Sequence, residues 1–219
     1  KTTVMVLCYL NLIDQGVDPN TICVVTFSNN AADEIRERIE KKATLPSTAS
    51  AKICTIHGFC NRTLKSIWDS RGIPHREMWN RAIHMGRIEN PQYFLSSVIE
   101  RTMDKHRLFG DFRPTLPDLE KYISYRYSRL QYDHAIIESD FGPDIAKAMH
   151  DVFVEYSKFL KENRLITFNT MLAHVEQWMI RNKAIRSMLQ TQNEIVISDE
   201  SQDLFPQASR IITTISQDA

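Results

Sequence analysis

The chain has 219 residues, of which 42% are hydrophobic and 25% are charged, and these proportions are ordinary for a globular protein with a real core. This length allows one large domain or two small ones. Lysine and arginine together number 27, as do aspartate and glutamate, so the formal net charge is zero and by itself predicts no affinity for nucleic acid. A local basic track is compatible with this neutrality, so a nucleic-acid-binding protein is not excluded.

The cysteines and the two ends of the chain bear on its cellular context. The 4 cysteines form no CxxC pair and have no histidines at zinc spacing, so we expect reduced thiols and an intracellular protein. No apolar run approaches the roughly 18 residues that a membrane span requires. The chain opens at Lys1 without an initiator methionine and stops at Ala219 soon after a strongly patterned segment. We therefore expect a piece cut from a longer protein.

The first predicted elements are a helix, a strand and a second helix. Residues 2–15 are apolar on more than one side of a helix, which predicts a helix covered by protein. Residues 22–27 (ICVVTF) form a short β-branched run that is typical of a buried parallel strand. Ser28 or Asn29 can then cap a helix that runs to about Lys42. The expected apolar face of that helix consists of Ala31, Ile35 and Ile39.

Two further strands complete the expected sheet. Residues 51–56 (AKICTI) and 194–198 (EIVIS) are short apolar runs, each followed by polar residues. The first is followed by a predicted helix over 57–70, which the residues at 71–74 (RGIP) end. The alternation of strand and helix predicts an α/β fold with a doubly wound parallel sheet.

The middle of the chain has a different character. Between about residues 73 and 164, strand-like runs vanish and prolines separate helical stretches. Apolar residues recur at helical spacing between Ile145 and Leu160, which predicts an amphipathic helix. We therefore expect an all-helical subdomain over 73–164, inserted into an α/β domain that consists of 1–72 and 165–219.

The strand at 194–198 ends in two adjacent carboxylates, Asp199 and Glu200. Ligands bind at the carboxyl ends of the strands in open parallel sheets. One acid there can hold Mg²⁺ while the next takes a proton from an attacking water. The alternative is a solvated turn or a helix cap, which is the usual explanation of an isolated Asp-Glu pair.

The opening residues Lys1-Thr2-Thr3 indicate a nucleotide site only in combination with these acids. At the start of a helix they can be the tail of a phosphate loop, with the lysine on the phosphates and a threonine hydroxyl on Mg²⁺. Taken alone they can equally be an exposed stub. A helix that opens with KTT and a strand that ends with DE are together the two parts of a site for a magnesium nucleotide.

Two further strand-to-helix junctions carry an aromatic residue next to small polar ones. Phe27 can stack on a base, and backbone amides beside Ser28 and Asn29 can hold a phosphate. His57 and Phe59 can do the same one strand further along. In the alternative interpretation both phenylalanines are core residues and the serine only caps a helix.

These motifs resemble those of the UvrD/Rep/PcrA group of superfamily 1 DNA helicases. The matching segments cover about residues 1–65 and 165–212, in the correct order: KTT, TFSNNAADEIRERI, TIHGFC, LITFNTML and ISDESQDLFPQ. The resemblance implies a RecA-like P-loop NTPase domain with an inserted helical accessory subdomain. It implies a helicase or translocase that uses ATP and Mg²⁺ to move on single-stranded DNA and to unwind duplex junctions, in DNA repair or recombination, together with further helicase domains. Such a protein is cytoplasmic in bacteria or archaea and nuclear or mitochondrial in eukaryotes.

The resemblance also assigns roles to residues at matching positions. Lys1 and Thr2, with Thr3 beside them, would bind the nucleotide, and Thr2 and Asp199 would hold Mg²⁺. Glu200 would be the general base. Gln202 would report the nucleotide state to the DNA track, and Asp203 would brace the loop. The side chains that would line single-stranded DNA are Phe27, Ser28, Asn29, His57 and Phe59.

Some positions depart from the pattern of these helicases. Asn30 stands where lysine is frequent, Thr167 where aspartate is common, and Ser198 where a strand residue is usually apolar. The glycines of the phosphate loop and a second motor domain are missing, so we expect the chain alone to hydrolyse ATP poorly. Two alternatives stay open: the ATPase part of a helicase-nuclease, and a non-catalytic DNA-binding or docking module of the same fold.

A basic-aromatic run lies within the predicted helical insertion. Residues 121–132 (KYISYRYSRLQY) interleave tyrosines with lysine and arginine. This pattern is compatible with a surface that meets DNA. In the alternative interpretation Tyr122 and Tyr125 pack inward and the arginines are solvated.

Overall fold

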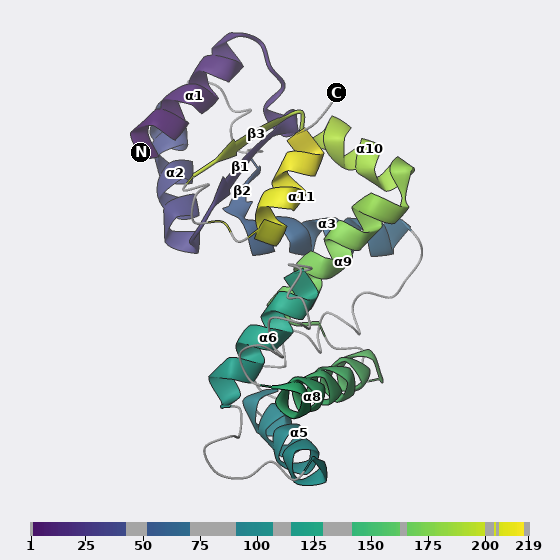
Figure 1. Ribbon diagram of the computed structural model, residues 1–219. Coiled ribbons are helices and arrows are strands. Elements are labelled where there is room, and N and C mark those ends of the chain that lie inside the picture. Colours follow the sequence, from purple (N-terminus) through teal and green to yellow (C-terminus); the bar gives the residue numbers. More distant parts are fainter. Residues whose placement is uncertain are drawn as a thin grey trace. The chain divides into compact units, whose positions relative to one another are not determined.

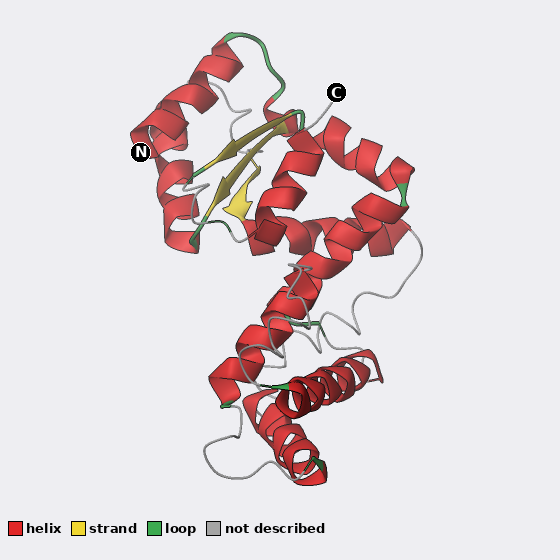
Figure 2. Ribbon diagram, in the orientation of Figure 1, coloured by secondary structure: helices red, strands yellow, loops and turns green. Residues whose placement is uncertain are grey.

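The computed structural model describes residues 2–42, 52–70, 91–106, 115–128, 142–162, 166–199, 204 and 206–216. Figure 1 shows the chain in sequence order, and Figure 2 shows its helices and strands by type. The chain divides into two compact units, which we call the sheet unit (Lys1–Arg71 with Met171–Ala219) and the helical unit (Gly72–Thr170).

A parallel sheet lies at the centre of the sheet unit. Its strands are β1 (Ile22–Thr26), β2 (Lys52–Thr55) and β3 (Ile195–Ser198), in the spatial order β2-β1-β3. Val24 of β1 pairs with Ile53 of β2 and with Ile197 of β3. All of β1 is buried, as its continuous apolar run predicts. The α/β fold class and the three strands are thus confirmed, with strand ends shifted by a residue.

Helices cover both faces of this sheet. The sheet unit contains α1 (Thr2–Asp14), η1 (Pro19–Thr21), α2 (Asn29–Lys42), α3 (Ile56–Ser70), most of α9 (Phe168–Arg181), α10 (Lys183–Gln192) and α11 (Pro206–Ser216). In Figure 1, α1 and α2 lie on one side of the strands and α3 and α11 on the other. α3 packs on β1 and β2, and α11 packs on β3. The arrangement is a three-layer α/β/α sandwich.

The core under α1 and α2 is built from alternate strand residues. Because side chains alternate across a strand, Ile22 and Val24 point to the same face, where they meet Tyr9 of α1 and Ile35 of α2. The buried stripe of α2 consists of Ala32, Ile35 and Ile39. The expected stripe was therefore wrong by one residue at its start, because position 32 is in line with 35 and 39 at helical spacing.

Two sides of α1 are covered by protein, and a third is exposed. Met5, Val6 and Tyr9 are buried, as expected for a helix packed on a sheet. Val4 and Leu7, however, are 61% and 53% exposed. The predicted cover of α1 is therefore confirmed for the faces on which it rested, since Leu10, Leu12 and Ile13 are partly buried against the same cluster. Val4 and Leu7 form a further, exposed side.

The helical unit has its own core. Its described helices are α5 (Pro91–Lys105), α6 (Leu116–Ser128) and α8 (Pro143–Glu162). One apolar cluster joins them, with Met103 of α5, Leu119 of α6 and Val152 of α8 fully enclosed. The amphipathic helix predicted from the spacing between residues 145 and 160 is confirmed as part of α8.

Several side chains in the described part of the basic-aromatic run, residues 121–128, make contacts within the helical unit. Tyr122 is buried, and its ring meets that of Phe153 edge-on. The Arg126 guanidinium lies 5.1 Å from the Phe153 ring centroid, a cation–π distance. Tyr125 is half-buried and Lys121 lies over its ring. The inward packing of Tyr122 favours the structural interpretation of this run.

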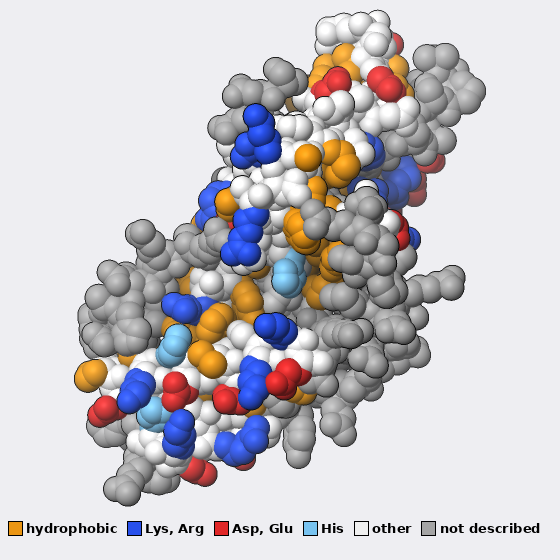
Figure 3. All heavy atoms as spheres, turned by 90° about the vertical axis from the view of Figure 1, so that its right-hand side faces the viewer, with side chains coloured by type: hydrophobic (Ala, Val, Ile, Leu, Met, Phe, Trp, Pro, Cys, Tyr) orange, Lys and Arg blue, Asp and Glu red, His pale blue; other side chains and the backbone are white. Residues whose placement is uncertain are grey.

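The surface of the helical unit mixes charges of both signs. Lys105 and His106 of the α5 end both contact Asp151 of α8, and the His106 Nε2 lies 2.9 Å from a carboxylate oxygen. The lower part of Figure 3, which shows this unit, has basic and acidic side chains interspersed. The described residues of this visible face therefore present no patch of a single sign. No helix among the residues that the structure describes is long and apolar enough to cross a membrane.

Candidate functional site

The turn from β1 into α2 is fixed by side-chain hydrogen bonds. The Thr26 hydroxyl is buried and donates to the Ser28 carbonyl oxygen at 2.9 Å. The Ser28 hydroxyl oxygen accepts from the backbone N–H of Ala31 at 3.2 Å, which is the geometry of a helix cap. The predicted capping role of Ser28 is confirmed. The backbone on both sides of Phe27 is thereby held in place.

Phe27 itself points away from the core. Its side chain is 65% exposed, although it directly follows five buried strand residues. The alternative that this phenylalanine is a core residue is therefore wrong. An exposed aromatic ring on a fixed turn is costly to leave in water, and it has a face available for stacking. Asn29, the first residue of α2, is exposed beside it.

The turn from β2 into α3 is built in a similar way. The Thr55 hydroxyl oxygen accepts from the backbone N–H of Gly58 at 3.1 Å. A Cβ at Gly58 would lie 3.3 Å from that hydroxyl oxygen and 3.4 Å from the Cys54 Cβ, so this close turn favours glycine. The first turn of α3 therefore lies directly against the end of β2.

The two remaining candidates on α3 behave differently. Phe59 is only 4% exposed. This burial corrects the prediction that its side chain lines a nucleic-acid strand, because the ring, at the fourth position past β2, is enclosed in the core. His57 is half-buried, and burial lowers the pKa of its imidazole below the usual value of 6.5. His57 is therefore largely neutral at pH 7.

β3 delivers Asp199 to the same edge of the sheet. The backbone N–H of Asp199 donates to the Val25 carbonyl oxygen at 3.0 Å, so pairing with β1 continues past Ser198. The Ser198 hydroxyl is buried and has no hydrogen-bond partner among the described residues. Asp199 is half-buried. The carboxyl ends of all three strands thus bring the β1, β2 and β3 candidates to one edge.

The start of α1 supplies a second part of the candidate site. Thr2 is half-buried in the first turn, and the Thr3 hydroxyl oxygen accepts from the Arg38 guanidinium at 3.2 Å. In the view of Figure 1 the N-terminal end of α1 lies on the same side of the sheet unit as the carboxyl ends of β1 and β3. A helix N-terminus attracts phosphate because its free N–H groups and its dipole are positive. The other predicted site residues, Lys1, Glu200, Gln202 and Asp203, lie outside the described residues.

The donor set at this edge fits a magnesium nucleotide. The Thr2 hydroxyl and the Asp199 carboxylate are oxygen donors, the type that Mg²⁺ prefers, and Mg²⁺ usually keeps waters and phosphate oxygens as its other ligands. The residues present are therefore chemically suited to this group.

Comparison with known proteins gives the family. The UvrD/REP helicase N-terminal domain model matches residues 1–219, which is the whole chain. The chain belongs to the UvrD/REP helicase N-terminal domain family. Members of this family use ATP with a divalent metal. The RecA-like α/β fold with its helical insertion, expected from the motifs, is thereby confirmed.

Named relatives of this UvrD/REP domain are helicases. The chain is 25% identical over 93% of its length to the "Probable DNA helicase II homolog" of Mycoplasma capricolum, and it spans 27% of that protein. It is 22% identical over 93% of its length to the "DNA helicase II" of Rickettsia typhi and spans 29% of it. A shorter match, 34% identical over 31% of the chain, covers 10% of an "ATP-dependent helicase/nuclease" subunit of Latilactobacillus sakei. The chain thus spans little more than a quarter of the DNA helicase II relatives.

Two contacts in this UvrD/REP domain were not expected from the sequence. Arg38 looks like part of an ordinary charged helix face, yet it joins α2 to Thr3 at the start of α1. Glu176 of α9 accepts a hydrogen bond from Gln207 of α11 and is only 6% exposed, although no motif in its segment predicts its burial. Both contacts join residues more than thirty positions apart. Local sequence patterns carry no signal for such pairs.

Proposed function

We propose that this chain is the ATP-binding part of a DNA helicase that couples ATP hydrolysis to movement on single-stranded DNA and to duplex unwinding, in DNA repair or recombination. The observation that carries the proposal is the edge where the strands end. There an exposed aromatic ring at Phe27 and a half-buried carboxylate at Asp199 end two hydrogen-bonded neighbouring strands. A nucleotide side and a nucleic-acid side on adjacent strands suit a motor whose DNA binding and ATP turnover are linked.

On the nucleotide side, each residue has a distinct task in the proposal. The Lys1 ammonium and the N-terminal end of α1 bind phosphate oxygens. The Thr2 hydroxyl and the Asp199 carboxylate hold Mg²⁺, which supplies neutralising charge on the phosphates. Glu200 accepts a proton from the attacking water, and Gln202 links the nucleotide state to the DNA track. The chain thus contributes positioning and charge stabilisation to in-line hydrolysis, without a covalent intermediate.

On the nucleic-acid side, Phe27 stacks on a base, and Ser28 and Asn29 contact a phosphate. Base stacking on an aromatic side chain is worth about 1–3 kcal/mol and tolerates any sequence, as a translocating motor requires. His57 contacts the strand from the neighbouring turn as a neutral hydrogen-bonding group. Phe59 supports that turn from the core rather than touching DNA.

The arrangement of the chain fits two roles for its two units. The sheet unit is the RecA-like ATPase part, and the helical unit is an accessory subdomain inserted into it. The partners are single-stranded DNA, duplex junctions and the remaining helicase domains. The DNA helicase II relatives are more than three times as long as the matched region, which leaves room for such domains.

The decisive experiment measures ATPase rate with and without single-stranded DNA on the full-length protein. Wild type, Glu200→Gln and the control Glu162→Gln are compared, since the Glu162 side chain is 62% exposed on α8. We expect DNA to stimulate wild type and control alike. Glu200→Gln should lower kcat by roughly 10²- to 10⁴-fold, the usual contribution of a general base. Absence of DNA stimulation, or an unchanged rate in Glu200→Gln, would show that the proposal is wrong.

A second candidate is the ATPase part of a helicase-nuclease. The match to the Latilactobacillus sakei helicase/nuclease protein, 34% identical over 31% of the chain, supports it. Degradation of labelled DNA by the full-length protein, in the presence of ATP and Mg²⁺, would distinguish the two. A protein that binds DNA but lacks any ATPase activity would instead be a docking module of the same fold.

A further inference from the structure

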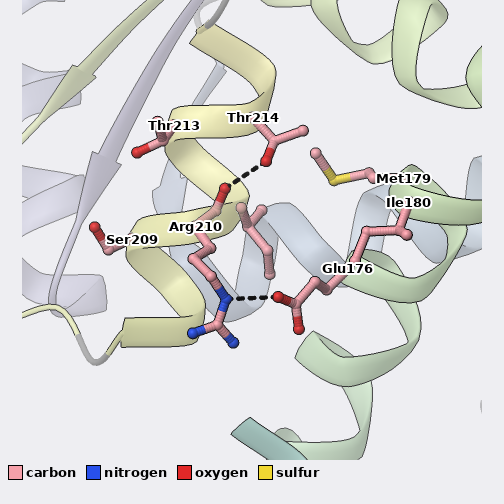
Figure 4. A pocket seen from close by; sticks show the side chains of 8 residues that line it. Glu176, Met179, Ile180, Ser209, Arg210, Thr213 and Thr214 are labelled. Atoms are coloured by element: carbon pink, nitrogen blue, oxygen red, sulfur yellow. Dashed lines mark hydrogen bonds and ion pairs between the residues drawn. The ribbon is translucent and has the colours of Figure 1, made fainter. Parts of the chain in front are cut away.

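A buried carboxylate joins α9 to α11 in the sheet unit. Glu176 of α9 is 6% exposed, and each of its two carboxylate oxygens has a partner on α11. The Gln207 amide donates to Oε2 at 3.1 Å, and the Arg210 Nε donates to Oε1 at 2.7 Å. Figure 4 shows Glu176 reaching from α9 towards Arg210 across the space between the two helices. Gln207 is 2% exposed, so the cluster is enclosed on its inner side.

The placement of these partners fixes α11 in two respects. Gln207 stands in the first turn of α11 and Arg210 one turn later on the same face. Two charge-assisted hydrogen bonds to one carboxylate therefore set both the height and the rotation of this helix end. At its other end, α11 is held by the Gln190 amide of α10, which donates to the Thr214 carbonyl oxygen at 3.0 Å.

The apolar packing between α9 and α11 leaves a gap beside this cluster. A pocket of about 260 Å³ lies beside Glu176, between α9 and α11, with Met179 and Ile180 on one side and Thr213 on the other. Ile180 is 56% exposed. Because side chains do not fill this space, the polar cluster adds to the alignment that the buried apolar residues of α11 provide.

α11 is in turn the support of β3. It packs on that strand, and its inner face is formed by Ala208, Ile211 and Ile215. β3 is half-buried along its whole length, and among the described strands it pairs with β1 alone. The position of its last residues therefore depends on the pairing with β1 and on the helix beneath it. Asp199 follows directly at the end of this strand.

We propose that Glu176 is a positioning residue for ATP hydrolysis: through Gln207 and Arg210 it fixes α11, and through α11 it fixes the end of β3 that carries Asp199. The inference rests on the proposed ATPase function and adds a residue that lies outside the helicase motifs. Errors of about 1 Å in the placement of reacting groups cost on the order of 10²-fold in rate. A contact that holds a magnesium carboxylate in place affects turnover more than nucleotide binding.

The test uses the full-length protein with saturating single-stranded DNA. Glu176→Gln keeps the shape of the side chain but removes its charge, and Glu162→Gln is the control. We expect kcat for ATP to fall roughly 10- to 100-fold, with KM for ATP unchanged within about threefold and more Mg²⁺ needed for half-maximal rate. The reciprocal swap, Glu176→Gln with Gln207→Glu, returns a carboxylate to the cluster beside Arg210. It should restore kcat to within about threefold of wild type, since the hydrogen-bonded cluster re-forms.

Several outcomes would overturn the inference. One is a folded Glu176→Gln protein with wild-type kcat, and another is a fall in kcat that matches the loss of folded protein measured by thermal unfolding. If Glu176→Gln does not fold, the variant Arg210→Lys tests the inference instead. It should fold, because the Arg210 side chain is 40% exposed and the substitution keeps its positive charge. A wild-type kcat in Arg210→Lys would then refute the role. A wild-type protein without DNA-stimulated ATPase would refute the proposed function instead.

Discussion

Replacing Phe27 by alanine tests the nucleic-acid side of the proposed site most directly. The ring is 65% exposed on a turn that Thr26 and Ser28 hold by hydrogen bonds. Removing an exposed side chain of this kind changes the free energy of unfolding by about 0.5 kcal/mol or less. Stacking on a base is worth about 1–3 kcal/mol, which corresponds to about 5- to 150-fold in the dissociation constant. Binding should therefore weaken while the fold stays intact.

The assay is fluorescence anisotropy of a labelled single-stranded oligonucleotide with the full-length protein, at one fixed salt concentration. Phe168→Ala is the matched control, because Phe168 is 68% exposed at the start of α9 and has no proposed contact with DNA. Phe27→Tyr should retain most of the affinity, since it keeps the aromatic face. If Phe27→Ala binds as tightly as wild type, or if Phe168→Ala weakens binding equally, the stacking argument is wrong.

Three further predictions concern stability. Ile35→Ala should lower the free energy of unfolding, measured by urea titration, by about 2–5 kcal/mol because Ile35 is 0% exposed. Leu7→Ala is its control and should change this free energy by less than about 0.5 kcal/mol, since Leu7 is 53% exposed. Ser28→Ala should cost about 0.5–2 kcal/mol in the same titration, since the cap of α2 is lost. Because burial lowers the pKa of His57, the unfolded chain binds more protons at this residue than the folded chain does below about pH 6.5. The free energy of unfolding should therefore fall as the pH drops through this range, and it should fall less in His57→Gln.

The strands and the helices that follow them could be predicted because their signals are local. The continuous apolar run of β1 marks a strand buried on both faces, and Ser28 marks the start of α2. Burial of a particular side chain is harder to predict, since it depends on the helix face that meets the sheet. Phe27 and Phe59 both follow a strand, yet the first is exposed and the second is in the core.

The contacts between distant segments could not be predicted at all. Glu176 meets Gln207 and Arg210 only because α9 and α11 are brought together by the fold. The exposed side of α1, at Val4 and Leu7, is equally apolar in sequence and lies beside the two faces predicted to be buried. An apolar stripe in a sequence predicts burial, but it does not say which segment supplies the cover.

The pairing of β3 with β1 also has a consequence for the order of events in folding. Val24 pairs with Ile53 within one short stretch of chain, but with Ile197 only across the whole helical unit. The loop that this second pairing closes is roughly six times longer, which adds about 1.6 kcal/mol of closure entropy. Non-local pairings of this kind slow folding. On the ribosome, the helical unit therefore emerges and can fold before the strand that carries Asp199 reaches its place in the sheet.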